Sequence, residues 1–186
     1  MKNALILHGT DATPDSNWFA WLKGELEQQG YSVWLPQLPG AEKPNTRTYN
    51  EFLLVNPDFV FNDETILIGH SSGAVEILSL LQHLPEGVTV KAAFLVSAFK
   101  DSLGWESLQD LFIDELNFEA IKTKAYRLAL IHSDNDPYVP IEHARYLQKH
   151  LDSELIVIPG QGHFNTELSP QYKQFPKLLE IIKEQS

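Results

Sequence analysis

The chain has 186 residues, of which 43% are apolar, 11% aromatic and 21% charged, and its 14 Lys and Arg against 25 Asp and Glu leave a formal net charge of −11. A chain of this length buries enough surface for a core without covalent staples, so one domain over residues 1–186 is expected. The absence of cysteine excludes disulfides, thiolate metal sites and a cysteine nucleophile. Because the basic residues are few and scattered, neither nucleic acid nor an anionic membrane surface is an expected partner.

The first apolar run, residues 4–7, follows a single lysine and is far shorter than the core of a signal peptide or a spanning helix. We therefore expect a cytoplasmic protein.

Short apolar runs alternate with longer amphipathic stretches along the chain. Six runs are typical of buried strands: residues 4–7, 32–35, 65–68, 92–96, 128–131 and 155–158. Four stretches between and after them predict helices: residues 18–29, 72–84, 141–151 and 172–183. Asp15, Ser16 and Asn17 precede the first helix as candidate caps. This βαβ alternation predicts an α/β fold with a mostly parallel sheet covered by helices on both faces.

Two stretches lack a clear period. Residues 36–57 contain four prolines and predict a loop with one short helix at about residues 49–54. Residues 99–124 place apolar side chains among acidic ones, which favours short helices over the sheet edge, in the position of a cap.

The strand pattern at residues 65–68 passes directly into the sequence GHSSG (residues 69–73) and then into a helical pattern. This arrangement predicts a nucleophile elbow, a sharp strand-to-helix turn that exposes the central Ser71. The flanking glycines carry no side chain that would clash in so tight a turn. A structural turn without chemistry is the less favoured interpretation.

A serine hydroxyl needs a base, and the base needs an acid to orient it, in the chain order Ser, acid, His. His163 lies in a glycine-rich loop directly after the last predicted strand, where a base would project over the carboxyl edge of the sheet. The other six histidines lie in helices, at a strand end or in the motifs at and before the serine: His8, His70, His83, His132, His143 and His150. Asp136 is favoured as the acid over Asp134, because the following Pro137 fixes the turn.

Two backbone N–H groups are expected to stabilise the oxyanion, those of Ser72 after the nucleophile and Thr10 after the first strand. In the strand order 2-1-3-4-5-6 the first and third strands are neighbours at the point where ligands bind in open α/β sheets. The loops that carry the oxyanion donors, the nucleophile, the acid and the base then meet at one edge.

The chain resembles compact α/β-hydrolases, specifically the family of retinoblastoma-binding protein nine and its small bacterial serine-hydrolase relatives. The resemblance runs nearly end to end and is carried by six segments: His8-Gly9, Trp18-Phe19-Ala20-Trp21-Leu22, Gly69-His70-Ser71-Ser72-Gly73, Leu95-Val96-Ser97-Ala98-Phe99, Asp136-Pro137-Tyr138-Val139-Pro140 and Gly162-His163-Phe164. It implies a three-layer α/β-hydrolase fold with little or no lid, the triad Ser71, Asp136 and His163, and hydrolysis of carboxylic esters or small amides.

The wall of the substrate pocket is less strongly indicated. Trp18, Trp21 and Trp105 are candidates for an apolar pocket, although aromatic residues at helical spacing more often belong to the core. Asp11 and Asp15 flank the oxyanion loop and match no family role; they would discourage anionic substrates, or form a solvated loop.

The resulting prediction is a serine hydrolase that acts on a small-molecule ester or amide through an acyl-enzyme, without cofactor or metal. The same triad would serve a peptidase or a thioesterase. From another class, a protein-binding member of the fold remains an alternative, although all triad residues and both glycines are present. A flavodoxin-like binder is disfavoured because the first turn lacks a glycine-rich phosphate loop, and a dehalogenase would need aspartate at position 71.

Overall fold

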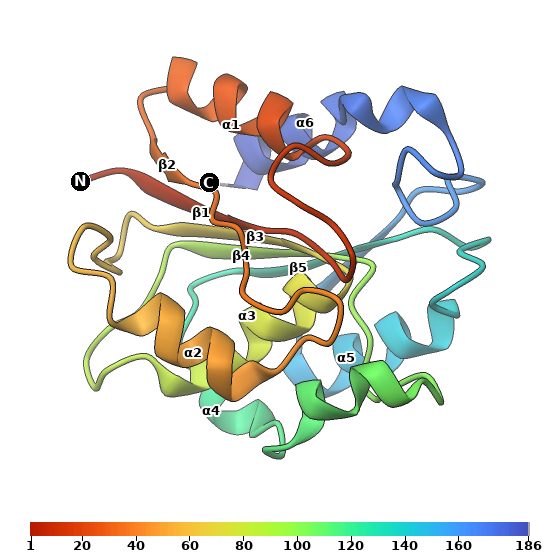
Figure 1. The fold of residues 1–186 in the computed structure, drawn as a ribbon. Coiled ribbons are helices and arrows are strands. Elements are labelled where there is room, and N and C mark those ends of the chain that lie inside the picture. The colour runs from red at the N-terminus through yellow and green to blue at the C-terminus, as the bar shows by residue number, and fades with distance from the viewer. Residues whose placement is uncertain (186) are drawn as a thin grey trace.

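The computed structural model describes residues 1–185 as one six-stranded sheet flanked by helices (Figure 1). All strand pairs are parallel, in the order β2-β1-β3-β4-β5-β6. The strands are β1 (Asn3–Leu7), β2 (Ser32–Trp34), β3 (Ile66–His70), β4 (Ala92–Val96), β5 (Leu128–His132) and β6 (Glu154–Val157). The α-helices are α1 (Phe19–Gln28), α2 (Thr46–Leu54), α3 (Ser72–His83), α4 (Phe118–Lys122), α5 (Ile141–Leu151) and α6 (Pro176–Gln185), with 3-10 turns η1 (Glu106–Phe112) and η2 (Pro170–Lys173).

The sheet separates two apolar layers, as Figure 1 shows with α1 and α6 on one face and α2 to α5 on the other. Side chains of a strand alternate between faces, so Ile66 and Ile68 pack with α1 and α6 while Leu67 packs with α3. The central strands are buried on both sides, which explains their continuous apolar runs.

The predicted fold and strand order are confirmed, and every strand lies within two residues of its expected bounds. The expected bounds of α5 are also those observed. The last helix is an exception, because it begins at Pro176 and not at Tyr172, which lies in η2. Proline restricts the residue before it and fits the first helical turn, so the helix starts there. In addition, the side chain of Asn17 does not cap α1, whose N-cap is Trp18.

Residues 99–124 do not form one cap. Leu108 and Leu111 of η1 pack with Phe99, Val75 and Val139 beside the carboxyl edge of the sheet. The second half, α4, instead packs on the outer face against α3 and α5. Only the first half of the segment, from Phe99 to η1, therefore contributes to the surroundings of Ser71. Within residues 1–185, no helix has the length and apolar character to cross a membrane.

Candidate active site

Ser71 stands in a strained turn between β3 and α3. Its φ of 55° and ψ of −122° lie outside the regions that ordinary residues occupy, and its N–H donates to the carbonyl of Val96 at 2.8 Å. The side chain lies at the carboxyl edge of the sheet and lines the two cavities described below. This is the geometry of a nucleophile elbow.

Gly69 and Gly73 permit that turn for steric reasons. A Cβ on Gly69 would lie 2.5 Å from the carbonyl oxygen of Gly73, and a Cβ on Gly73 would lie 2.5 Å from the carbonyl oxygens of Leu7 and His8. All of these neighbours are backbone atoms, which cannot move aside as a flexible side chain would. The elbow and β1 are thus packed too closely for any side chain at either position.

His163 and Asp136 are in direct contact, although 27 residues separate them. Nδ1 of His163 lies 2.7 Å from Oδ2 of Asp136, and the two side chains are 8% and 0% exposed. Ser71 lines the same two cavities as His163. Among the described residues, no hydrogen bond joins the Ser71 hydroxyl to the His163 imidazole. Such contacts often tighten only when substrate binds.

The Asp136 carboxylate is held from several directions. Oδ1 accepts the N–H groups of Tyr138 and Val139 at 2.9 and 3.0 Å, and Oδ2 also accepts the Ser97 hydroxyl at 3.0 Å. Burial by itself would raise the pKa of Asp136, but the hydrogen bond and charge of His163 and the two backbone donors outweigh it, so the pKa is lowered. The carboxylate is therefore charged and fixed in orientation.

Asp134 lies in the same β5–α5 loop but has another role. Its Oδ1 accepts the N–H of Gly160 at 2.8 Å, and the neighbouring Asn135 Oδ1 accepts the N–H of Gly162 at 2.7 Å. These bonds tie the loop that carries Asp136 to the loop that carries His163. The structure brings Asp136, and not Asp134, against His163.

Thr10 and Ser72 lie together beside the elbow. The Thr10 hydroxyl donates to the Ser72 hydroxyl at 3.0 Å, which joins the loop after β1 to the first turn of α3. Within residues 1–185, neither residue's backbone N–H donates to another group of the protein. Both N–H groups are therefore available as hydrogen-bond donors to an oxyanion.

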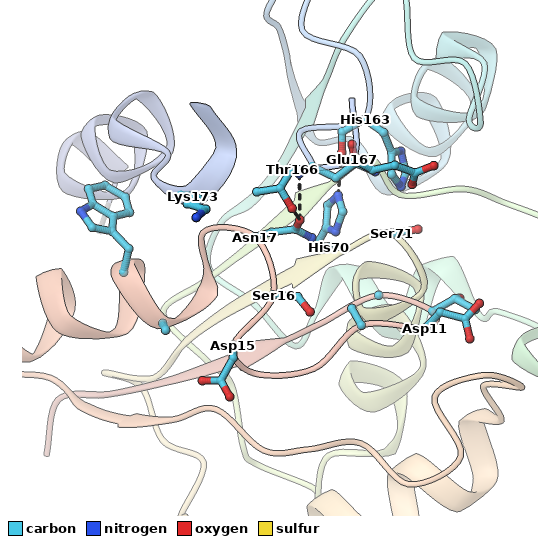
Figure 2. A pocket seen from close by; sticks show the side chains of 16 residues that line it. Asp11, Asp15, Ser16, Asn17, His70, Ser71, His163, Thr166, Glu167 and Lys173 are labelled. Atoms are coloured by element: carbon cyan, nitrogen blue, oxygen red, sulfur yellow. Dashed lines mark hydrogen bonds between the residues drawn. The ribbon is translucent and has the colours of Figure 1, made fainter. Parts of the chain in front are cut away.

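Two cavities meet at Ser71 and His163. The first, here called the polar cavity, has a volume of about 550 Å³ and runs along the loop after β1 (Figure 2). Its charged lining residues are Asp11, Asp15, Glu167 and Lys173. The second, here called the apolar cavity, has a volume of about 300 Å³ and lies under η1. Its apolar and aromatic lining residues are Phe99, Leu103, Trp105, Leu108, Tyr138 and Val139.

The three tryptophans predicted as pocket candidates lie in three different places. Trp21 lines the polar cavity, and Trp105, which is 50% exposed, lines the apolar cavity. The expectation that Trp18 lines a substrate pocket is wrong: its side chain is fully buried, and its Nε1 donates to the carbonyl of Phe164 at 3.0 Å. Helical spacing places Trp18 on the core face of the chain, where its polar end still needs a partner.

Several residues of the site escaped the sequence reasoning. Ser97 follows the end of β4 with a φ of 51° and donates to Asp136. Tyr138 packs its ring edge-on against His163 and donates its hydroxyl to Glu167 at 2.9 Å. Their position after strand ends was the available signal, because those strand ends meet at the edge where Ser71 and His163 lie. Among residues 1–185, no three His, Asp or Glu side chains gather as metal ligands.

The comparisons with known proteins agree with this geometry. The family model described as "Serine hydrolase" matches residues 4–184, nearly the whole described chain. The chain belongs to the serine hydrolase family. Among curated relatives, it is 29% identical over 164 residues to "Putative hydrolase YdeN" of Bacillus subtilis (strain 168), covering 88% of this chain and 86% of the relative. It is 27% identical over 169 residues to "Serine hydrolase RBBP9" of Rattus norvegicus, covering 89% and 84%.

Solved structures show the same fold. The crystal structure of the YdeN gene product of B. subtilis has a TM-score of 0.91 and 25% identity, covering 99% of this chain and 98% of that one. Est1E of Butyrivibrio proteoclasticus superposes with a TM-score of 0.68 at 16% identity, covering 98% and 88%. The resemblance stated from the sequence motifs is thus confirmed, and this chain is a compact member of the serine hydrolases.

Proposed function

We propose that this serine hydrolase cleaves a carboxylic ester or small amide with Ser71 as nucleophile, His163 as base and Asp136 as the orienting acid. The observation that carries the proposal is the buried 2.7 Å contact between His163 and Asp136 at the cavities that Ser71 lines. Because Nδ1 of His163 is bound to the carboxylate, Nε2 is the nitrogen left for proton transfer.

In the first half of the reaction, Nε2 of His163 takes the hydroxyl proton as Ser71 Oγ bonds to the carbonyl carbon. The N–H groups of Thr10 and Ser72 stabilise the resulting oxyanion, and the Asp136 carboxylate stabilises the imidazolium. The imidazolium then gives its proton to the leaving alcohol or amine as the bond to the carbonyl carbon breaks. In the second half, His163 activates a water that releases the acid and restores Ser71.

The two cavities suggest the shape of the substrate. The apolar cavity under η1 suits a compact apolar acyl group, because Phe99, Leu103 and Leu108 gain from excluding water. The polar cavity suits the leaving group. It carries Asp11, Asp15 and Glu167 against Lys173 alone, so a negatively charged leaving group is disfavoured there. No step of this mechanism needs a cofactor or a metal.

A fluorophosphonate probe tests the nucleophile, because it forms a covalent bond only with an activated serine. We expect wild-type protein to be labelled and Ser71→Ala to remain unlabelled. Ser72→Ala is a matched control that keeps labelling, because it loses only the hydroxyl that accepts from Thr10. Equal labelling of wild type and Ser71→Ala, or labelling of neither, would contradict the assignment.

A panel of acyl esters, aminoacyl amides, peptides and thioesters, run on wild type and Ser71→Ala, tests the substrate class. We expect the highest kcat/KM for esters or small amides with a compact acyl group. Higher kcat/KM for peptides or thioesters would redirect the assignment to those classes. Turnover of none of them would favour a protein-binding role on the same fold.

A further inference from the structure

The loop that carries the base, residues 163–166, is held at three of its four residues by side chains from far away in the chain. His70 Nε2 lies 2.8 Å from the carbonyl oxygen of His163, and Trp18 Nε1 donates to the next carbonyl at 3.0 Å. Asn17 Oδ1 accepts both the N–H and the hydroxyl of Thr166, at 2.9 and 3.0 Å. Figure 2 marks the hydrogen bonds of Asn17 and His70 to this loop with dashed lines.

The base loop needs such support because its backbone is strained and shielded from water. Phe164 is fully buried and has a φ of 52°, a conformation that costs a bulky residue free energy. Contacts from the surrounding residues must therefore hold Phe164 in this conformation. The indole of Trp18 packs edge-on against His70 with ring centroids 5.9 Å apart, so the two donors form one buried unit under the loop.

His70 acts here as a neutral donor. A carbonyl oxygen only accepts, so Nε2 must carry the proton, and the remaining Nδ1 is buried without a partner among the described residues. Burial, followed by the nearby His163, lowers the pKa of His70 to about 3, which keeps the ring uncharged at neutral pH. His70 is therefore no second base, although it directly precedes the nucleophile.

We propose that Asn17, Trp18 and His70 are positioning residues that set the imidazole of His163 against Asp136 and Ser71. His70 is the last residue of β3, so its bond places the base relative to the elbow itself. Asn17 and Trp18 place the same loop relative to the start of α1. This inference rests on the proposed function, since it gives a catalytic reason for three residues that the triad does not include.

Substitutions at His70 provide the main test. His70→Leu removes the donor, whereas the side-chain amide of His70→Gln can still reach the carbonyl of His163. We expect His70→Leu to lower kcat by about 100-fold with KM unchanged, because small displacements of a catalytic group have effects of that size. His70→Gln should recover most of that loss. Asn17→Ala and Asn17→Asp form a second pair, in which the carboxylate of Asn17→Asp keeps the acceptor for Thr166.

The pH profile of kcat/KM separates positioning from mere stability. The titratable groups around His163 are Asp136, His70, His132 and Tyr138, together with Asp11, Asp15, Glu167 and Lys173 across the cavities. A base loop that loses His70 holds the imidazole less well against the Asp136 carboxylate, so the imidazolium is less stabilised. We therefore expect the acid limb of the profile to move to lower pH in His70→Leu and to return in His70→Gln.

Two matched variants control for lost stability. Leu81→Ala opens a cavity in the core around α3, far from the site, and Trp34→Phe shortens an aromatic side chain on the β2 edge. Both should keep the wild-type pH profile and kcat at temperatures where they are folded. The inference is overturned if His70→Leu behaves like Leu81→Ala, or if His70→Gln recovers nothing. Absence of labelling in wild type would instead overturn the proposed function.

Discussion

The loops of Ser71, the proposed nucleophile, and of His163, the proposed base, reach the same cavities by different physical means. The turn of the elbow is formed by chain neighbours, β3, GHSSG and α3, and its two glycines avoid backbone clashes within the turn and with Leu7 and His8. The base loop has no such local design. It depends on partners 27 to 149 residues away, among them Asp136, His70 and Asn17. The elbow is thus fixed by sterics and the base loop by hydrogen bonds. Substitutions in the elbow should therefore lower stability together with activity, whereas substitutions on the base side should lower activity with little change in stability.

The largest expected effect is a loss of kcat on the side of the proposed base, with the fold left intact. Asp136→Asn keeps the shape of the side chain but loses the charge that stabilises the imidazolium and orients His163. We expect kcat to fall about 10⁴-fold, as in other triads, while the melting temperature changes little. Steady-state ester hydrolysis and thermal unfolding measure the two quantities.

Asp134→Asn is the matched control in the same loop, because an amide oxygen can still accept the Gly160 N–H. It should retain kcat within about threefold, since no charged partner is lost. Equal losses in the two variants would argue that the loop as a whole, and not the Asp136 carboxylate, supports the base.

The next effect breaks the elbow through its sterics. Gly73→Ala places a Cβ 2.5 Å from the backbone oxygens of Leu7 and His8, so β1 and α3 must move apart. We expect the free energy of unfolding to fall by about 3 kcal/mol, together with activity. Gly24→Ala in α1 is the control, because nothing lies within 4 Å of its new Cβ. It should be neutral or stabilising by up to about 1 kcal/mol, as chemical denaturation would show.

A smaller effect concerns Glu76, on the helix that follows the elbow. Glu76 is fully buried and neither carboxylate oxygen has a partner within residues 1–185, so burial raises its pKa well above the usual value. The folded state then holds the proton more tightly than the unfolded state. Its contribution to stability is therefore present below the unfolded pKa of about 4.3 and is lost as pH rises toward the folded pKa.

Glu76→Gln removes this titration. We expect the free energy of unfolding at pH 7 to increase, and its decline between pH 5 and 7 to become shallower. Denaturant titrations at both pH values measure this, with the exposed Glu86→Gln as control. An unchanged pH dependence in Glu76→Gln would mean that Glu76 is charged in the folded state.

The smallest effect leaves both loops intact and alters the apolar cavity. Trp105 is half exposed and meets Tyr138 edge-on, so Trp105→Ala widens the cavity at little cost in stability. We expect the ratio of kcat/KM for a hexanoyl over an acetyl ester to change by about tenfold, the value of one or two buried methylenes. Trp21→Ala in the polar cavity should leave that ratio unchanged. If Trp21→Ala changed the ratio and Trp105→Ala did not, the polar cavity would bind the acyl group and the apolar cavity the leaving group.

The parts predictable from the sequence are those with a short-range physical signature. Apolar runs and amphipathic spacing located the strands and helices, and GHSSG located the elbow, because glycine placement is a local steric requirement. Asn17 shows the limit: its type and position are those of a helix cap, yet its side chain binds Thr166. A polar side chain satisfies whichever partner the fold brings near, and spacing along one chain does not reveal a partner 149 residues away.

The sequence by itself determined the acidic, cysteine-free α/β chain, its parallel strand order and the residues Ser71, Asp136 and His163 as candidates for one site. Only the tertiary structure decided that His163 contacts Asp136, that Trp18 donates to the carbonyl of Phe164 from the core, and that a polar and an apolar cavity meet at Ser71. The physical reason is that strand and turn propensities act over a few residues, whereas contacts and cavities arise from how loops of different strands pack at the sheet edge.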